Sequence, residues 1–507
     1  MGSSISRIRR SSTDSPASCL PVEIWQAIFD QLSISDLVTL LRVSRYISGA
    51  ASAHDTYCRA FIIRADQRPL PSLDQLRTRL ASPKEPKPLL CVDISFGHAY
   101  DMAPYTDSVL ALVAEHMHRV ECLKLDLPPS GGVQQIRTML DGKPAPLLRS
   151  LTIIYRACHA YCFPCWTTPG KISPSLFQDQ APKLRDLQLH NVVLRKEVYP
   201  AFIHARELRL FFDKDQPADT PIFQASHWPK LQTLHVRGPY WNYEGRATPN
   251  PGVTISNMDR EDQERALAHL TTPMSKYVAV TDPSTETSKT LSKHLDDSKT
   301  IYLTVRTMQL PNCRQIHLEF EDALEARRRL FVTEWDILED VKPAAAQFRD
   351  ILAVEDINGL IQRCSVVLLD YDIESQVDIF SLLTQSQNYR LSCEALCLTF
   401  GSLAEGSLLS LFAGHRELRL DVLPALRRLV ICCYYPNAPS VDEATSTLSI
   451  LLRAVRKKLS PEQLKDFELI YTRNANAAIQ CARAPPRTHP NLPSSSWTRI
   501  DLHMNAG

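Results

Sequence analysis

A short pattern of apolar residues, written apolar-x-x-apolar-x-apolar, recurs along most of the chain and constrains its fold more than any other feature. Side chains of a strand alternate between its two faces, so the last two apolar positions of each copy share one face. Between copies, apolar residues recur at helical spacing, as at Val109, Leu112 and Val113. The pattern therefore predicts a strand followed by a helix or loop, repeated many times. The copies begin at Val120, Leu148, Leu184, Ala205, Leu231, Cys313, Cys364, Cys393, His415 and Leu426.

Two finer regularities indicate that these segments are copies of one unit. The string Arg-Glu-Leu-Arg-Leu occurs at Arg206–Leu210 and again at Arg416–Leu420. In several copies a proline stands two residues before the first apolar position, where it can end a helix or loop before the strand begins. These prolines are Pro146, Pro182, Pro229 and Pro424.

A strand and a helix repeated at roughly 20–35 residues are typical of an α/β solenoid, and this region resembles a leucine-rich-repeat domain. The copies depart from that family in their spacing, which runs 28, 36, 21 and 26 residues and then breaks. Only Asn191 lies near the place where family repeats carry an asparagine that satisfies turn backbone groups. The strands at Leu418 and Leu429 are 11 residues apart, too close for a helix. We predict an irregular solenoid; the alternative is a mixed α+β domain with short parallel strands.

The segment before the repeats predicts three short helices. Pro21 suits the first position of a helix, since its missing N–H costs nothing there. Trp25, Ile28, Phe29 and Leu32 then form one apolar stripe at helical spacing. A unit this small carries more apolar surface than it can bury, so an exposed apolar stripe indicates an interface.

The second and third helices follow directly. The hydroxyl of Ser35 can cap the second helix, whose apolar face is Leu37, Leu40 and Leu41. A third helix is expected from Ser44 through Ala53.

These residues resemble an F-box. The resemblance lies in Leu20-Pro21-x-Glu23-Ile24, Ile28-Phe29-x-x-Leu32, Asp36-Leu37-x-x-Leu40 and Val43-Ser44-Arg45-Tyr46. It implies that the helices dock on the Skp-type adaptor of cullin-based ubiquitin ligases. The contacts implied are Leu20, Pro21, Ile24, Ile28, Phe29, Leu32, Leu37, Leu40 and Val43. The alternative is an ordinary N-terminal helical cap of a larger domain.

An F-box followed by leucine-rich repeats is a known pairing, which implies the substrate-recognition subunit of a Skp–cullin–F-box ubiquitin ligase. The repeats would hold a target protein for ubiquitin-dependent proteolysis, and no residue of this chain would catalyse a reaction. An alternative is a non-degradative scaffold that binds the adaptor. It could associate with a membrane, because Met1-Gly2 and Ser6 fit the N-myristoylation pattern, with Arg7, Arg9 and Arg10 as an electrostatic second signal.

The fold class is thus α/β, an N-terminal three-helix F-box followed by an irregular leucine-rich-repeat-like solenoid. Proline-rich, charged and polar stretches set the expected boundaries. We expect a disordered tail (1–18), the F-box (19–64), a connector (65–88) with a helix at Leu73–Leu80, repeats (89–239), a polar insertion (240–300) with a helix near Asp259–Leu270, further repeats (301–473) and a flexible tail (474–507).

Motifs of catalysis and cofactor binding are missing from the sequence. It contains no glycine-rich phosphate loop, no Gly-x-Ser-x-Gly and no His-Glu-x-x-His, so we expect neither an enzyme nor a cofactor. Cys158, Cys162 and Cys165 have a zinc-like spacing. A closed zinc site needs a second ligand pair, which does not follow, so we interpret this cluster as a thiol-containing loop without metal.

Composition and charge exclude further classes of protein. Lys and Arg total 57 against 56 Asp and Glu, and no basic cluster predicts nucleic-acid binding. The sequence contains no run of 18 apolar residues, so we predict no transmembrane helix. Residues 1–18 lack the apolar core of a secretory signal. Fourteen cysteines without such a signal indicate a reducing compartment, so we expect a cytoplasmic and/or nuclear protein.

Overall fold

The computed structural model describes residues 20–500 with gaps. The longer gaps are 55–58, 65–69, 82–88, 97–102, 128–135, 156–169, 213–221, 245–250, 296–300, 336–343, 372–382, 384–391, 401–422, 434–466 and 485–496. The predictions for Gly2, for Cys158, Cys162 and Cys165, and for the strand beginning at His415 lie outside the described residues. The chain forms two compact units, Met1–Phe223 with His227–Leu231 (unit 1) and Gln224–Ser226 with Gln232–Gly507 (unit 2).

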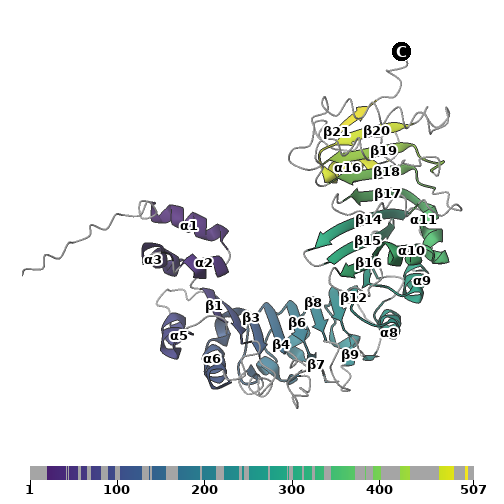
Figure 1. Cartoon of the computed structure of the whole chain (residues 1–507). Helices are drawn as coiled ribbons and strands as arrows, with labels where there is room; N and C mark the ends of the chain where they lie inside the picture. The colour runs from purple at the N-terminus through teal and green to yellow at the C-terminus, as the bar shows by residue number, and fades with distance from the viewer. Residues whose placement is uncertain are drawn as a thin grey trace, which may run out of the picture. The chain divides into compact units, whose positions relative to one another are not determined.

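Unit 1 begins with the helices α1 (Val22–Gln31), α2 (Ile34–Leu40) and α3 (Arg45–Ala53), visible at the purple end of the chain in Figure 1. Pro21 is the residue before α1 rather than its first residue. Ser35 lies inside α2, which begins one residue before it and thus earlier than predicted. Helix α3 packs against both α1 and α2. Their shared core is Trp25, Phe29, Leu37, Ile47 and Ala51.

A parallel sheet follows in unit 1, with its strands side by side in chain order. Parallel neighbours need a crossover between them, and here the crossovers shorten from helices to 3₁₀ turns. The strands are β1 (Ala60–Arg64), β2 (Leu90–Ser95), β3 (Val120–Leu127), β4 (Ser150–Tyr155), β6 (Asp186–His190) and β8 (Glu207–Phe211). The crossover elements are α5 (Leu73–Leu80), α6 (Ala103–Glu115), η3 (Met117–Arg119), η4 (Leu176–Asp179) and η5 (Pro200–Phe202).

The predicted connector helix is confirmed as α5. Ser72 caps it, accepting a hydrogen bond from the Gln75 N–H while the Gln75 side chain accepts one from the Ser72 N–H. This capping box satisfies two backbone donors at the start of the helix.

Apolar residues of the recurring pattern line one face of the unit 1 sheet. On β3, Leu123 and Leu125 are buried, and Lys124 between them is only half-buried. The last two apolar positions of every copy within the described residues lie on a strand, which confirms that part of the prediction, whereas the first position often precedes the strand, as at Leu148 and Leu184. Two further short strands, β5 (Gly170–Lys171) and β7 (Val192–Val193), pair with each other.

Unit 2 contains a mostly parallel sheet interrupted by an antiparallel segment. Strands β14, β15 and β16 pair antiparallel, and this segment joins β13 on one side to β17 on the other through parallel pairs. The strands in spatial order are β10 (Thr233–Arg237), β12 (Gly252–Ser256), β13 (Tyr277–Thr281), β16 (Arg327–Trp335), β15 (Cys313–Asp322), β14 (Ile301–Leu310), β17 (Cys364–Tyr371), β18 (Ala395–Phe400), β19 (Arg428–Cys433), β20 (Glu468–Thr472) and β21 (Trp497–Ile500).

The remaining described elements include four helices between strands of unit 2 and one near its end. Helix α10 packs against β15 and β16, and α16 packs against β18 and β19. The helices are α8 (Arg260–Leu270), α9 (Thr285–Lys293), α10 (Ala344–Leu352), α11 (Glu355–Arg363) and α16 (Ala475–Arg483). Two short strands, β9 (Ile222–Gln224) and β11 (Asn242–Glu244), and the turn η6 (Ala225–His227) complete the set.

Two segments differ from their predicted character. The expected polar insertion at 240–300 contributes β12 and β13 to the sheet, because Val253, Ile255, Val278 and Val280 are buried despite polar surroundings. Its predicted helix is confirmed as α8, with Asp259 as the N-cap. The expected flexible tail at 474–507 contains α16 and β21, with Asn474 capping α16.

Left-handed residues mark the carboxyl ends of several strands. Asn191, Gly238, Asn257 and Asp282 each follow a strand directly and have φ of 54, 100, 51 and 50°. Glycine, asparagine and aspartate tolerate this conformation best, so the residue types fit their positions. The N–H of Asn191 donates to the Phe211 carbonyl, at the end of the neighbouring strand.

Candidate functional site

Helix α1 has two apolar faces. Trp25 and Phe29 point into the helical core, are 8% and 0% exposed, and stack with their ring centroids 5.6 Å apart. Ile24 and Ile28 also lie four residues apart but are 47% and 37% exposed. Residues at i and i+4 share a helix face, so the two isoleucines form a separate stripe that the protein leaves uncovered.

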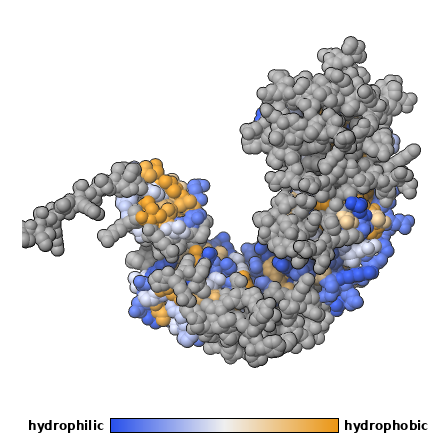
Figure 2. Space-filling view, viewed as in Figure 1, coloured by the Kyte–Doolittle hydropathy of each residue, from blue (hydrophilic) through white to orange (hydrophobic). Residues whose placement is uncertain are grey.

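Further large apolar side chains of the helical domain are exposed as well. Leu20 before α1, Val43 after α2 and Tyr46 on α3 are 38%, 61% and 43% exposed. The Tyr46 hydroxyl donates to the Leu20 carbonyl at 3.0 Å, which ties α3 to the start of α1. We call Leu20, Ile24, Ile28, Val43 and Tyr46 the apolar surface. Figure 2 shows hydrophobic residues gathered over these helices.

The structure divides the predicted adaptor contacts into three groups. Leu20, Pro21, Ile24, Ile28 and Val43 are exposed, whereas Leu32 and Leu40 are half-buried against the helical core. Phe29 and Leu37 are 0% exposed and belong to that core, so we correct their assignment from contact residues to residues that support the surface.

Tyr46 was absent from the predicted contacts, although it stands in the Val43–Tyr46 run that carries the resemblance. Its position on the same side as Leu20 depends on how α3 packs on α1, which spacing along one helix does not specify. The only sequence signal for it was the run itself.

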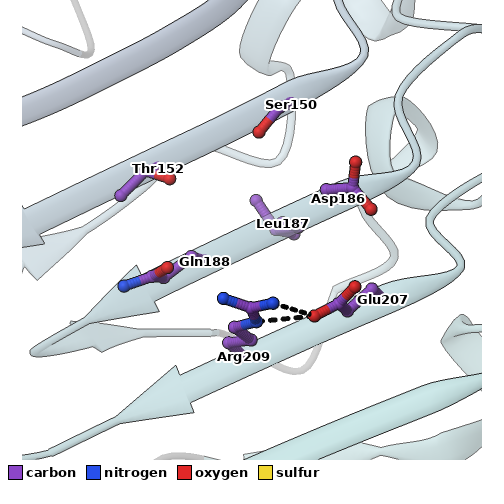
Figure 3. A pocket seen from close by; sticks show the side chains of 7 residues that line it. All are labelled: Ser150, Thr152, Asp186, Leu187, Gln188, Glu207 and Arg209. Atoms are coloured by element: carbon purple, nitrogen blue, oxygen red, sulfur yellow. Dashed lines mark hydrogen bonds and ion pairs between the residues drawn. The ribbon is translucent and has the colours of Figure 1, made fainter. Parts of the chain in front are cut away.

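A second candidate surface is the polar face of the unit 1 sheet. Two rows of register partners cross β4, β6 and β8 there. One row is Ser150, Asp186 and Glu207, and the other is Thr152, Gln188 and Arg209. Together with Leu187 they line a hollow of about 380 Å³. Figure 3 shows these side chains on three neighbouring strands.

Of the two carboxylates that line this hollow, Glu207 forms an ion pair with Arg209. The Arg209 Nε donates to the Glu207 Oε1 at 2.6 Å (Figure 3). Burial and the neighbouring Glu207 carboxylate raise the pKa of Asp186, and the Arg209 charge opposes that shift. The hollow therefore offers carboxylate acceptors, an amide and hydroxyls, which suit hydrogen bonding to polar or basic side chains of another molecule.

The sequence pattern locates this surface in part. Thr152, Gln188 and Arg209 are the residues between the second and third apolar positions of their copies, which must face away from the core. The pattern does not show that the second row falls in register beside the first. That register comes from pairing between strands.

The described residues form neither a metal-binding cluster nor a membrane-spanning helix. They contain no group of three or more His, Cys, Asp or Glu side chains that could hold a metal ion. No helix formed by them is both long enough and apolar enough to cross a membrane.

Comparison with protein families connects the helical surface to a known domain. Residues 17–62 match the model of the F-box-like family, a range that includes α1, α2 and α3 and ends within β1. The search of curated proteins found no match. The family match supports an F-box protein, and domains of this family typically bind adaptors of the Skp type.

Proposed function

We propose that this protein is the substrate-recognition subunit of a Skp–cullin–F-box ubiquitin ligase. The observation that carries the proposal is the apolar surface, which lies within the residues that match the F-box-like family. When a partner covers exposed apolar side chains, the removal of their surface from water contributes roughly 25 cal/mol of favourable binding free energy for each Å². Cullin would be reached through the adaptor.

The helical core gives the apolar surface a fixed shape. Trp25 and Phe29 anchor α1 from behind, and the hydrogen bond from Tyr46 to Leu20 fixes its start. A preformed surface loses little conformational entropy on binding, so more of the buried area contributes to affinity. The support residues therefore act on adaptor binding through geometry, and the exposed residues act through contact.

The rest of the chain would hold the target protein. We propose an irregular leucine-rich-repeat-like architecture for it, supported by parallel strands at uneven spacing and by the turn asparagine Asn191. The polar face of unit 1, with the hollow between β4 and β8, would contact polar or basic side chains of the target. Its role would be to hold a target lysine near the ubiquitin carrier, with no bond chemistry by this chain.

Reconstitution tests the proposal as a whole. The full-length protein, mixed with purified Skp-type adaptor, cullin and the ubiquitin-transfer enzymes, is expected to form one complex. Proteins bound to it in a cytoplasmic or nuclear extract are expected to gain ubiquitin. A complex with adaptor that excludes cullin, or bound proteins that gain no ubiquitin, would favour the alternative of a non-degradative scaffold. In that case mass measurement of the N-terminal peptide decides whether Gly2 carries a myristoyl group.

A further inference from the structure

Two cysteines face each other across neighbouring strands of the unit 1 sheet. Cys91 on β2 and Cys122 on β3 are register partners in a parallel pair, and both are free thiols. Neighbouring strands lie about 4.8 Å apart. Disulfides form over Cα separations of about 4.4–6.8 Å, so the pairing places the two thiols within bonding range.

A bulge produces this pairing. Leu90 pairs with Val120, yet the next residue, Cys91, pairs with Cys122, so Glu121 is the extra residue. Without the bulge, Cys91 would oppose Glu121. Bulges re-aim side chains and are common beside functional sites.

Both cysteines are partly exposed. Cys91 and Cys122 are half-buried on the polar face, whereas the residues that follow them, Val92 and Leu123, are buried on the opposite face. By contrast, Cys364 and Cys393 are 0% exposed. The chain thus contains one described pair of neighbouring half-exposed thiols and a set of enclosed thiols for comparison.

Electrostatics favour a thiolate at Cys91. The hydrogen bond from the Cys122 thiol lowers the pKa of Cys91 to about 7, burial and the Glu121 charge oppose this shift, and the Arg59 charge assists it. Arg59 is held nearby by its ion pair with Glu121 at 3.0 Å. The same contact raises the pKa of Cys122. Thiolates are the nucleophilic form, so Cys91 is the attacking sulfur and Cys122 the resolving one.

From this geometry we infer that Cys91 and Cys122 form a reversible oxidation site, which low-molecular-weight disulfides such as oxidised glutathione convert to an intrachain disulfide. The Cys91 thiolate attacks one sulfur of glutathione disulfide, forms a mixed disulfide and releases one glutathione thiolate. Cys122 then loses its proton and attacks the Cys91 sulfur, which releases the second glutathione. Two protein thiols are oxidised, and one glutathione disulfide is reduced to two thiols.

This site does not depend on the proposed function. It lies in the same register row as Ser150, Asp186 and Glu207, so its oxidation state alters the surface beside the hollow.

The test treats the full-length native protein with oxidised glutathione, alkylates the remaining thiols and maps the peptides by mass spectrometry. The expected product is one peptide pair linked through Cys91 and Cys122, with Cys364 and Cys393 still thiols. In Cys122→Ser, Cys91 is expected to remain glutathionylated, and in Cys91→Ser, Cys122 is expected to stay mostly a thiol. If Cys91 and Cys122 remain thiols, or if Cys91 links to another cysteine, the inference is wrong.

A second measurement needs no variant. The rate of Cys91 alkylation in the native wild-type protein, followed by peptide mapping at pH 5–9, is expected to reach half its maximum near pH 7. A half-maximum at or above the ordinary thiol value of about 8.5 would contradict the thiolate assignment.

Discussion

The side-chain amide of Asn191 donates a hydrogen bond to the Tyr155 carbonyl oxygen at 2.7 Å, which joins the turn after β6 to the end of β4. Asn191 and Tyr155 are 1% and 5% exposed, so losing this hydrogen bond removes a partner from a carbonyl that lies away from water. The Asn191 N–H also donates to the Phe211 carbonyl at 2.8 Å on the far side. One residue therefore links the ends of three neighbouring strands.

Replacing Asn191 with alanine is expected to destabilise unit 1 by about 2–4 kcal/mol. Roughly half of this loss of stability comes from the missing hydrogen bond to the Tyr155 carbonyl, and the rest comes from holding alanine at a positive φ. The midpoint of urea unfolding, followed by tryptophan fluorescence, measures the loss. Asn191→Gly is the matched control, since glycine keeps the backbone conformation and is expected to lose only the hydrogen-bond part. Equal midpoints for wild type and Asn191→Ala would contradict this role.

The ion pair between Arg428 and Glu468 holds the end of unit 2 together. Both side chains are 4% exposed, and the Arg428 Nε donates to the Glu468 Oε2 at 2.7 Å. Arg428 also donates to the Cys481 carbonyl of α16 at 2.7 Å. Arg428→Ala leaves a buried carboxylate and is expected to cost about 3–5 kcal/mol. Limited proteolysis is expected to cut near α16 in this variant before other sites.

The control for that prediction replaces both charges. Arg428→Met with Glu468→Leu removes the pair without leaving an uncompensated charge, so it is expected to be less destabilised than Arg428→Ala. Protection of α16 from protease in Arg428→Ala at the wild-type level would show that the pair does not hold the helix.

The lowered pKa of His317 is expected to make the stability of the protein depend on pH. Burial lowers its pKa to about 4, and the charges of Arg329 and Arg306 act in the same direction. The unfolded chain has an ordinary histidine pKa near 6.5, so the unfolded state binds the proton first as the pH falls. Stability is therefore expected to decline between pH 6.5 and about 4, by about 2 kcal/mol at pH 5.

The measurement compares the stability of wild type and His317→Gln at pH 7 and pH 5. The variant is expected to lose less stability over this range, because glutamine does not titrate. His317 packs edge-on against Phe331 at 4.4 Å, so the variant is also expected to be less stable at both pH values. An identical pH dependence in both proteins would rule out His317 as the source.

A variant of Arg209 tests the proposed target-binding face separately from the helical domain. Arg209→Ala opens the ion pair with Glu207 and is expected to reduce capture of target proteins several-fold, with adaptor binding unchanged. Arg206→Ala is the matched control, since Arg206 is exposed on the same segment and does not line the hollow. Equal target capture by the two variants would argue against this face.

The recurring apolar pattern located the strands on which its copies fall, but it did not predict how those strands pair. Cys313 and Cys364 begin identical patterns, yet β15 is antiparallel to both neighbours and β17 is parallel to both. The pattern records which face is buried, and that requirement is the same in either direction. Strands β12 and β13 were missed because the polar composition of the whole segment 240–300 outweighs the short apolar runs that contain Val253 and Val278.

Periodicity within α1 left a similar ambiguity. Trp25 with Phe29 and Ile24 with Ile28 both satisfy the spacing of a helix face, and only packing shows which pair faces the core. The sequence therefore predicted an interface on these helices but assigned Phe29 and Leu37 to its surface. For the residues of the hollow, the sequence predicted only that those between two apolar positions face away from the core.

Adaptor docking through the apolar surface is tested most directly by the affinity of the purified protein for a Skp-type adaptor, measured by calorimetry for wild type, Ile28→Arg and Gln26→Arg. Both residues are exposed on α1 and both changes add one positive charge, but only Ile28 belongs to the apolar surface. Burying that charge is expected to weaken binding by Ile28→Arg at least 10-fold, about 1.4 kcal/mol, with Gln26→Arg close to wild type. Wild-type affinity in Ile28→Arg would contradict adaptor docking through this surface.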